Sequence, residues 1–251
     1  ARLREECPLA ASAVDLVMRC CAQLPAALRG ERTRIQELLV EPARIEWDDY
    51  RSRYPAHALA NAMVVGAAQQ LAIEQTQQDN RSGNGTHKLR ILEIGAGCGA
   101  LTAPLLAALD GQIDVYHATD ADVGALEILR ERLGSEHPHL VTSVLDLKND
   151  ATAQGLAVEG FDLVVAGGGI HVASSWALLL VRGLLRPGGH FLLVEPVRPT
   201  RLAESTYGVL EDWWTLSDAR QRRGYPLLSG HEWQAVLSDE GFSVALLPVA
   251  P

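Results

Sequence analysis

The chain has 251 residues, of which 47% are hydrophobic and 21% charged, and its formal net charge is -9 at pH 7. This length and composition are typical of a globular protein with one large domain, or with a core domain and a smaller one attached. We expect no nucleic-acid partner, because phosphate backbones are bound by clustered cations and the sequence has no sustained lysine or arginine run.

Apolar and cysteine patterns bear on the compartment. The longest strongly apolar stretch, residues 176–185, contains Arg182 and is too short to span a bilayer. No signal-like segment opens the chain, so we expect a cytoplasmic protein with no membrane partner. The four cysteines show neither C-x-x-C spacing nor pairing with histidine, so we expect reduced thiols and no metal site.

Residues 1–74 have helical periodicity and almost no strand pattern. Apolar residues recur at spacings of three and four over residues 10–30, and Gly30 suits the end of a helix. A second apolar helical face runs through residues 57–75. We expect a helical lid over 1–74 and a linker over the polar, turn-rich segment 75–88.

Short apolar runs alternate with helix-length segments over residues 89–251, the predicted core domain. The five runs occupy residues 88–97, 112–120, 139–147, 160–168 and 189–196. Continuous apolar strands between helices are typical of a parallel sheet covered on both faces. We therefore predict an α/β, Rossmann-like fold with a mostly parallel, doubly wound sheet.

Two more features follow the fifth run. A sixth strand is predicted over residues 241–250. Residues 196–228 form a long insert, and inserts at the rim of such a sheet usually shape a substrate pocket. Trp213 and Trp214 in this insert could line an acyl pocket or anchor the insert to the core, and adjacent residues are expected to point differently.

The first strand runs into the glycine-rich turn LEIGAGCGALT. Three alternate glycines permit a tight turn and a close approach of ligand to backbone: Gly95, Gly97 and Gly99. With Ala100 the spacing also satisfies the dinucleotide fingerprint, so a nicotinamide cofactor is an alternative. Glu93 favours S-adenosylmethionine, because an acidic side chain suits its cationic amino-acid end and would repel a pyrophosphate.

Aspartates follow the second and third strands. Asp120 could accept both ribose hydroxyls, a role that either cofactor would use. Asp146 could bind the adenine amino group, or it could be an ordinary turn aspartate.

These features, with the helix-ProGlyGly-strand pattern of residues 184–196, resemble class I S-adenosylmethionine-dependent methyltransferases. Residues 208–242, and the pairing of IHVA after the fourth strand with LLVEP in the fifth, are similar to carbon-methyltransferase domains of polyketide synthases. The resemblance implies S-adenosylmethionine as cofactor, S-adenosylhomocysteine as product, and methylation of the α-carbon of a β-ketoacyl thioester. It also implies two kinds of partner, an acyl carrier protein with a phosphopantetheine-linked acyl chain and the neighbouring synthase domains.

The resemblance also assigns residues. It implies a catalytic pair, His171 and Glu195. Adjacent parallel strands end at one rim, so Glu195 could accept a hydrogen bond from one imidazole nitrogen and leave the other basic. A histidine that only caps a loop is the alternative. The implied cofactor contacts are Glu93, Gly95, Gly97, Gly99, Asp120, Ala121, Asp146, Leu147 and Gly167.

The remaining candidates concern the substrate. Tyr50 and Tyr54 could bring a phenol from the lid to the substrate carbonyl, or could only pack within the lid. Gly167 and Gly168 could leave room for donor and thioester, although the family more often has asparagine at the second position. Methylation of oxygen and a non-catalytic scaffold role are the alternative functions.

Overall fold

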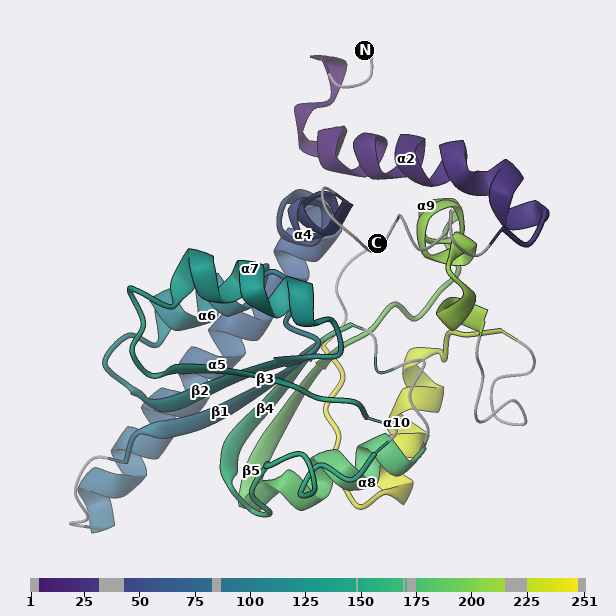
Figure 1. Cartoon of the computed structure of the whole chain (residues 1–251). Coiled ribbons are helices and arrows are strands. Elements are labelled where there is room, and N and C mark those ends of the chain that lie inside the picture. Colours follow the sequence, from purple (N-terminus) through teal and green to yellow (C-terminus); the bar gives the residue numbers. More distant parts are fainter. Residues whose placement is uncertain are drawn as a thin grey trace. The chain divides into compact units, whose positions relative to one another are not determined.

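The computed structural model describes residues 5–31, 43–82, 87–147, 149–168, 170, 175–214 and 225–247 (Figure 1). Its contacts divide the chain into two compact units. We call Leu59–Gly168 with Leu179–Val194 the sheet unit, and Ala1–Ala58 with Gly169–Leu178 and Glu195–Pro251 the helical unit. Helices α5 (Pro55–Ser82) and α8 (Ser175–Leu184) each run from one unit into the other.

The sheet unit is built on five parallel strands in the order β3-β2-β1-β4-β5. This arrangement confirms the predicted parallel α/β sheet. The strand order reverses between β1 and β4, since β2 and β3 follow on one side of β1 and β5 follows on the far side of β4. Ligands of such folds bind beyond the carboxyl ends of the strands at this reversal. The strands are β1 (Leu89–Ile94), β2 (Ile113–Asp120), β3 (Leu140–Val144), β4 (Phe161–Gly167) and β5 (Leu185–Val194).

One face of the sheet forms the main hydrophobic core. Strand register places Ile91 beside Tyr116 and Leu163, and all three are at most 2% exposed. Helices α5 and α6 (Thr102–Ala108) pack on this face, and α6 and α7 (Val123–Leu133) lie along one side of the sheet (Figure 1). The helical residues in this core include Val64, Ala68, Ala72, Leu105, Leu106 and Leu129.

The helical unit packs around α2 (Ala11–Leu28). The predicted helix end is confirmed, since Gly30 has φ +73° and its N–H donates to the carbonyl of Ala27. Leu16 and Cys20 of α2 are buried against Tyr50. The other elements are η1 (Pro8–Ala10), α4 (Ala43–Arg53), α9 (Arg201–Thr206), η4 (Tyr207–Val209), η5 (Glu211–Trp214) and α10 (Gly230–Asp239).

Residues Pro8–Leu28 form a helix that is long and apolar enough to cross a membrane by length and composition. This helix is longer than the apolar stretch 176–185, which is too short to span a bilayer. A core helix of a soluble protein can pass the same test, and one side of α2 packs in the helical unit.

The predicted linker over 75–88 is partly helical. Helix α5 continues to Ser82, and residues 83–86 lie outside the described part of the chain. Gln recurs in residues 75–82 and is a good helix former, as is Arg, and side chains four residues apart are hydrogen-bonded, as in the pair Gln75 and Asp79 at 2.9 Å. The polar composition therefore marks a solvated helix end as well as a turn.

The prediction of a sixth strand over 241–250 is wrong for its described part. Residues 243–247 have no strand structure, and residues 248–250 lie outside the described residues. Leu246 is 44% exposed and Leu247 65% exposed. An apolar run becomes a strand only where a neighbour supplies ladder hydrogen bonds, and the sheet described here has five strands.

Candidate active site

The glycine loop leaves β1 in a conformation that requires glycine. Gly95 has φ +74°, and a side chain there would place Cβ 3.3 Å from the carbonyl oxygen of Gly168. A Cβ on Gly99 would lie 3.2 Å from Cδ1 of Leu133 in α7. The loop thus passes closely between the end of β4 and α7, where added atoms would displace backbone or core.

Strand β2 holds this loop through hydrogen bonds. The N–H groups of Gly95 and Ala96 donate to the carbonyl of Thr119 over 2.9 and 3.0 Å. The N–H of Gly97 donates to Oδ2 of Asp120 over 2.9 Å. Each carboxylate oxygen has a second acceptor position, so Asp120 can fix the loop and still accept a ribose hydroxyl.

Glu93 is buried below the loop and is 1% exposed. Its Oε2 accepts hydrogen bonds from Thr102 Oγ1 over 2.6 Å and from Tyr116 Oη over 2.7 Å. Sequence reasoning missed both partners. A carboxylate inside an apolar strand was the available signal, because such a group needs buried hydrogen-bond donors nearby.

The other predicted cofactor contacts lie at the ends of β2, β3 and β4, and they differ in burial and in hydrogen bonding. Asn149 Nδ2 donates to Oδ2 of Asp146 over 2.8 Å, a contact typical of a turn aspartate. Leu147, next to it, is half-buried, and Ala121 is exposed directly after β2. The space beside Gly167 is filled, since a Cβ there would lie 3.1 Å from Cδ2 of Leu101.

The two residues of the predicted catalytic pair are described unequally. His171 lies outside the described residues, so its side chain has no described contacts. Glu195 is half-buried and directly follows Val194, the last residue of β5. Val194 pairs with Gly167 at the end of β4, so Glu195 is the first residue after the carboxyl end of β5. The glycine loop begins at the same carboxyl edge of the sheet, after β1.

The helical unit contains an aromatic cluster, defined by Trp47, Tyr50, Tyr54, His57, Tyr207 and Trp213. The ring of Tyr50 stacks on Tyr54 at 5.3 Å and meets His57 edge-on at 4.7 Å. Burial, with a smaller contribution from Arg51, lowers the pKa of His57 to about 4, so its imidazole is neutral near pH 7. Sequence reasoning did not single out His57.

The adjacent tryptophans of the insert differ in exposure. Trp213 is 3% exposed and stacks on Tyr207 at 5.3 Å. Trp214 is 48% exposed, and its Nε1 donates to the carbonyl of Gly208 over 2.9 Å. Trp213 therefore anchors the insert within the helical unit, while Trp214 stays about half exposed and meets Tyr225 edge-on at 6.1 Å between ring centroids.

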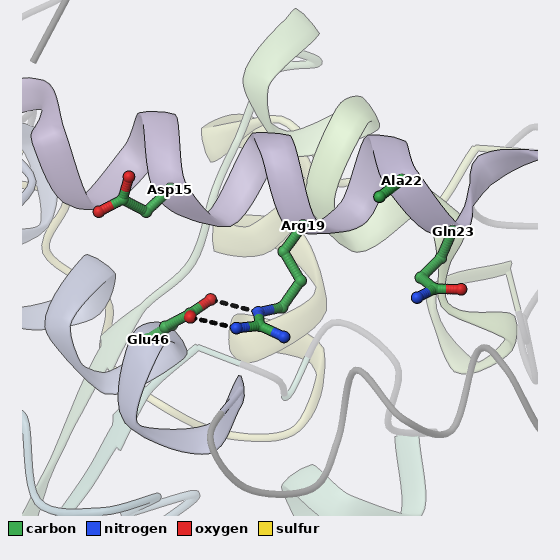
Figure 2. Close-up of a pocket in the computed structure, with 5 residues that line it drawn as sticks. All are labelled: Asp15, Arg19, Ala22, Gln23 and Glu46. Atoms are coloured by element: carbon green, nitrogen blue, oxygen red, sulfur yellow. Dashed lines mark hydrogen bonds and ion pairs between the residues drawn. The ribbon is translucent and has the colours of Figure 1, made fainter. Parts of the chain in front are cut away.

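Among the described residues, two hollows are lined by side chains outside the glycine loop. One, of about 350 Å³, has Asp15, Arg19, Ala22 and Gln23 on α2, and the guanidinium of Arg19 binds both carboxylate oxygens of Glu46 on α4 (Figure 2). This ion pair ties the two helices together. The other, of about 330 Å³, lies at the amino ends of strands and is lined in part by Leu89, Asp162, Leu163, Arg186 and His190.

Comparison with known proteins gives a family match to this loop and sheet. Residues 92–191 match the family model described as a methyltransferase domain. Over 162 residues the chain is 41% identical to the fumosorinone synthetase of Cordyceps fumosorosea (strain ARSEF 2679). This alignment covers 63% of this chain and 4% of that protein. Over 258 residues it is 31% identical to the highly reducing polyketide synthase valA of Aspergillus terreus, covering 96% of this chain and 10% of that protein.

A solved structure is similar over nearly the whole chain. The crystal structure of the CurJ carbon methyltransferase superimposes with a TM-score of 0.82 at 27% identity, covering 99% of this chain and 65% of that one. The chain thus spans a tenth or less of the two synthases and about two thirds of the solved domain. The chain has the fold of class I S-adenosylmethionine-dependent methyltransferases, its residues 92–191 match a methyltransferase domain, and it is similar to the carbon-methyltransferase domains of polyketide synthases.

Proposed function

We propose that this chain methylates the α-carbon of a β-ketoacyl thioester carried by an acyl carrier protein. The observation that carries this proposal is the arrangement of residues that follow the carboxyl ends of β1, β4 and β5. There the glycine loop lies against Gly168, and Glu195 continues from the paired end of β5. The similarity to a carbon methyltransferase and to polyketide synthases supports the choice of carbon and of a carrier-bound substrate.

The residues at this edge suit S-adenosylmethionine. Gly95 and Gly99 leave backbone open where a Cβ would meet neighbouring atoms, and Glu93 keeps a buried carboxylate below the loop. Gly97 is held by Asp120, which can also bind a ribose hydroxyl. The bound cofactor would supply an electrophilic methyl group.

The reaction then needs a base in the protein. His171 accepts the acidified α-proton of the substrate, and the electron pair of the broken C–H bond becomes the enolate that is methylated at carbon. Glu195 accepts a hydrogen bond from the other imidazole nitrogen, which fixes the tautomer and stabilises the imidazolium. General-base catalysis of this kind contributes roughly 10²–10⁴-fold.

Other residues would shape the substrate site. The half-exposed Trp214 and the phenol of Tyr54 are the accessible candidates to contact the acyl chain, because Trp213 and Tyr50 are almost fully buried. Docking of the carrier protein and of neighbouring synthase domains, and a cytoplasmic location, belong to the same proposal.

The test is methylation of a β-ketoacyl carrier protein in the presence of S-adenosylmethionine. We expect the acyl chain to gain the mass of one methyl in place of hydrogen, with NMR locating it on the α-carbon. A methoxy signal would establish oxygen methylation instead. Absence of methyl-donor binding by calorimetry would leave a scaffold role, and unchanged activity of His171→Ala would refute the assigned base.

A further inference from the structure

The carboxylate of Glu93 is held at one oxygen by two buried hydroxyls. Thr102 comes from the start of α6 and Tyr116 from β2, and both are 0% exposed. Their hydrogen bonds to Oε2 are 2.6 and 2.7 Å long. Hydrogen bonds to an ionised acceptor are short and about twice as strong as neutral ones. Since both donors are buried, these two protein hydroxyls orient the carboxylate.

The direction of the tyrosine hydrogen bond follows from its surroundings. Burial raises the pKa of Tyr116 well above its usual range, and the nearby charge of Glu93 raises it further. The phenol therefore keeps its proton at any physiological pH. Tyr116 is a permanent donor to Glu93.

The main chain at the same place is held by a different residue. Thr119 Oγ1 donates to the carbonyl oxygen of Glu93 over 2.7 Å. The carbonyl of Thr119 in turn accepts from the N–H groups of Gly95 and Ala96. Thr119 thus fixes the backbone of the loop, whereas Thr102 and Tyr116 bind the carboxylate of Glu93. The two effects can be separated by substitution.

Stability alone does not account for a charge at this position. Replacing a buried charged network by apolar residues of similar volume is often neutral or stabilising, because removing charges from water is costly. A negative charge retained below a ligand-binding loop favours a cationic ligand group. In the proposed cofactor that group is the ammonium of the amino-acid end.

We propose that Thr102 and Tyr116 are positioning residues that aim the Glu93 carboxylate and thereby make the site select ligands with an ammonium-bearing amino-acid end. This inference rests on the proposed function, which supplies the identity of the cofactor. It adds two specificity-determining residues, one on α6 and one on β2, that need not touch the ligand themselves.

Two ligands separate this role from general support of the loop. S-adenosylhomocysteine has the amino-acid end, and 5′-methylthioadenosine keeps the adenosine and thioether but lacks it. In calorimetric titrations, Tyr116→Phe and Thr102→Val should each weaken S-adenosylhomocysteine binding about 3- to 10-fold, the effect of one hydrogen bond to a charged group only partly transmitted. Binding of 5′-methylthioadenosine should be unchanged, and Thr102→Ser should restore wild-type selectivity.

Thr119→Val is the matched control, because it removes a buried hydroxyl that donates to the backbone carbonyl of Glu93 and not to its carboxylate. It should weaken both ligands by the same factor. A wild-type ratio of the two affinities in Thr102→Val and Tyr116→Phe would overturn the inference, while tight wild-type binding of S-adenosylhomocysteine would leave the proposed function standing. If the wild type binds neither ligand, both fail. If Tyr116→Phe does not fold, Thr102→Val against Thr102→Ser decides.

Discussion

The two units of this chain hold their functional residues in different ways. In the sheet unit, the predicted cofactor residues are fixed by hydrogen bonds to neighbouring strands, as Gly97 is by Asp120 and Glu93 by Tyr116. In the helical unit, the described candidates are held by aromatic packing, as Tyr50 is by Tyr54 and His57. The first arrangement suits a constant cofactor, and the second suits the acyl chain of the proposed substrate, which offers few polar groups.

The largest expected effect concerns the residue after β5. Glu195→Gln should lower the methylation rate by about 10²–10⁴-fold, because an amide stabilises the imidazolium poorly and can select the wrong tautomer. Affinity for S-adenosylhomocysteine, measured by calorimetry, should stay at the wild-type value. An equal loss of rate and of affinity would mean that Glu195 supports the cofactor site and not the base.

The tryptophan pair tests the packing of the helical unit. Trp213→Ala should lower the free energy of unfolding by about 3–5 kcal/mol, because it empties a buried site against Tyr207. Trp214→Ala should lower it by about 1 kcal/mol through loss of the hydrogen bond to Gly208. Urea unfolding of the two variants measures both values, and equal losses would contradict the assignment of Trp213 as the anchor.

The aromatic cluster also predicts a pH dependence. The pKa of His57 is about 4 in the folded chain, whereas its ordinary value is 6.5. Between pH 6.5 and pH 4 the imidazole is therefore protonated in the unfolded chain and neutral in the folded chain. The free energy of unfolding therefore decreases as the pH falls from 6.5 towards 4, by up to about 3 kcal/mol from His57. His57→Gln should show a correspondingly smaller loss between pH 7 and pH 4.5 in urea unfolding, and identical losses would refute this.

A smaller effect is expected in the sheet unit. Asp120→Asn should weaken S-adenosylhomocysteine binding about 10-fold, because the loop loses its charged acceptor at Gly97. Asp150→Asn is the matched control, since Asp150 Oδ1 accepts from the N–H two residues ahead, as Asp120 Oδ1 does. Calorimetry should show wild-type affinity for the control, and equal weakening in both variants would point to a general charge effect.

The sequence predicted the sheet unit well, because its signals are local. An apolar run of strand length and a glycine turn directly after it are read within a few residues. The partners of Glu93 are not local in this sense: Thr102 is 9 residues away and Tyr116 is 23 residues away on another strand. Sequence periodicity does not predict such a contact, because the contact depends on the register between strands.

The helical unit was harder to predict for the same reason. Its aromatic cluster joins residues 47–57 to residues 207–213, two segments that only the fold brings together. The sixth strand was over-predicted because apolar composition does not reveal whether a neighbouring strand supplies hydrogen bonds.

The central claim is that His171 removes the α-proton of a β-ketoacyl thioester. Exchange of that proton in deuterated water, followed by mass spectrometry of the carrier-bound substrate with S-adenosylhomocysteine present, measures this step without methyl transfer. We expect the wild type to exchange the proton about 10²–10⁴-fold faster than His171→Ala, with equal cofactor affinity in the two proteins. Equal exchange rates in the two proteins would contradict the account.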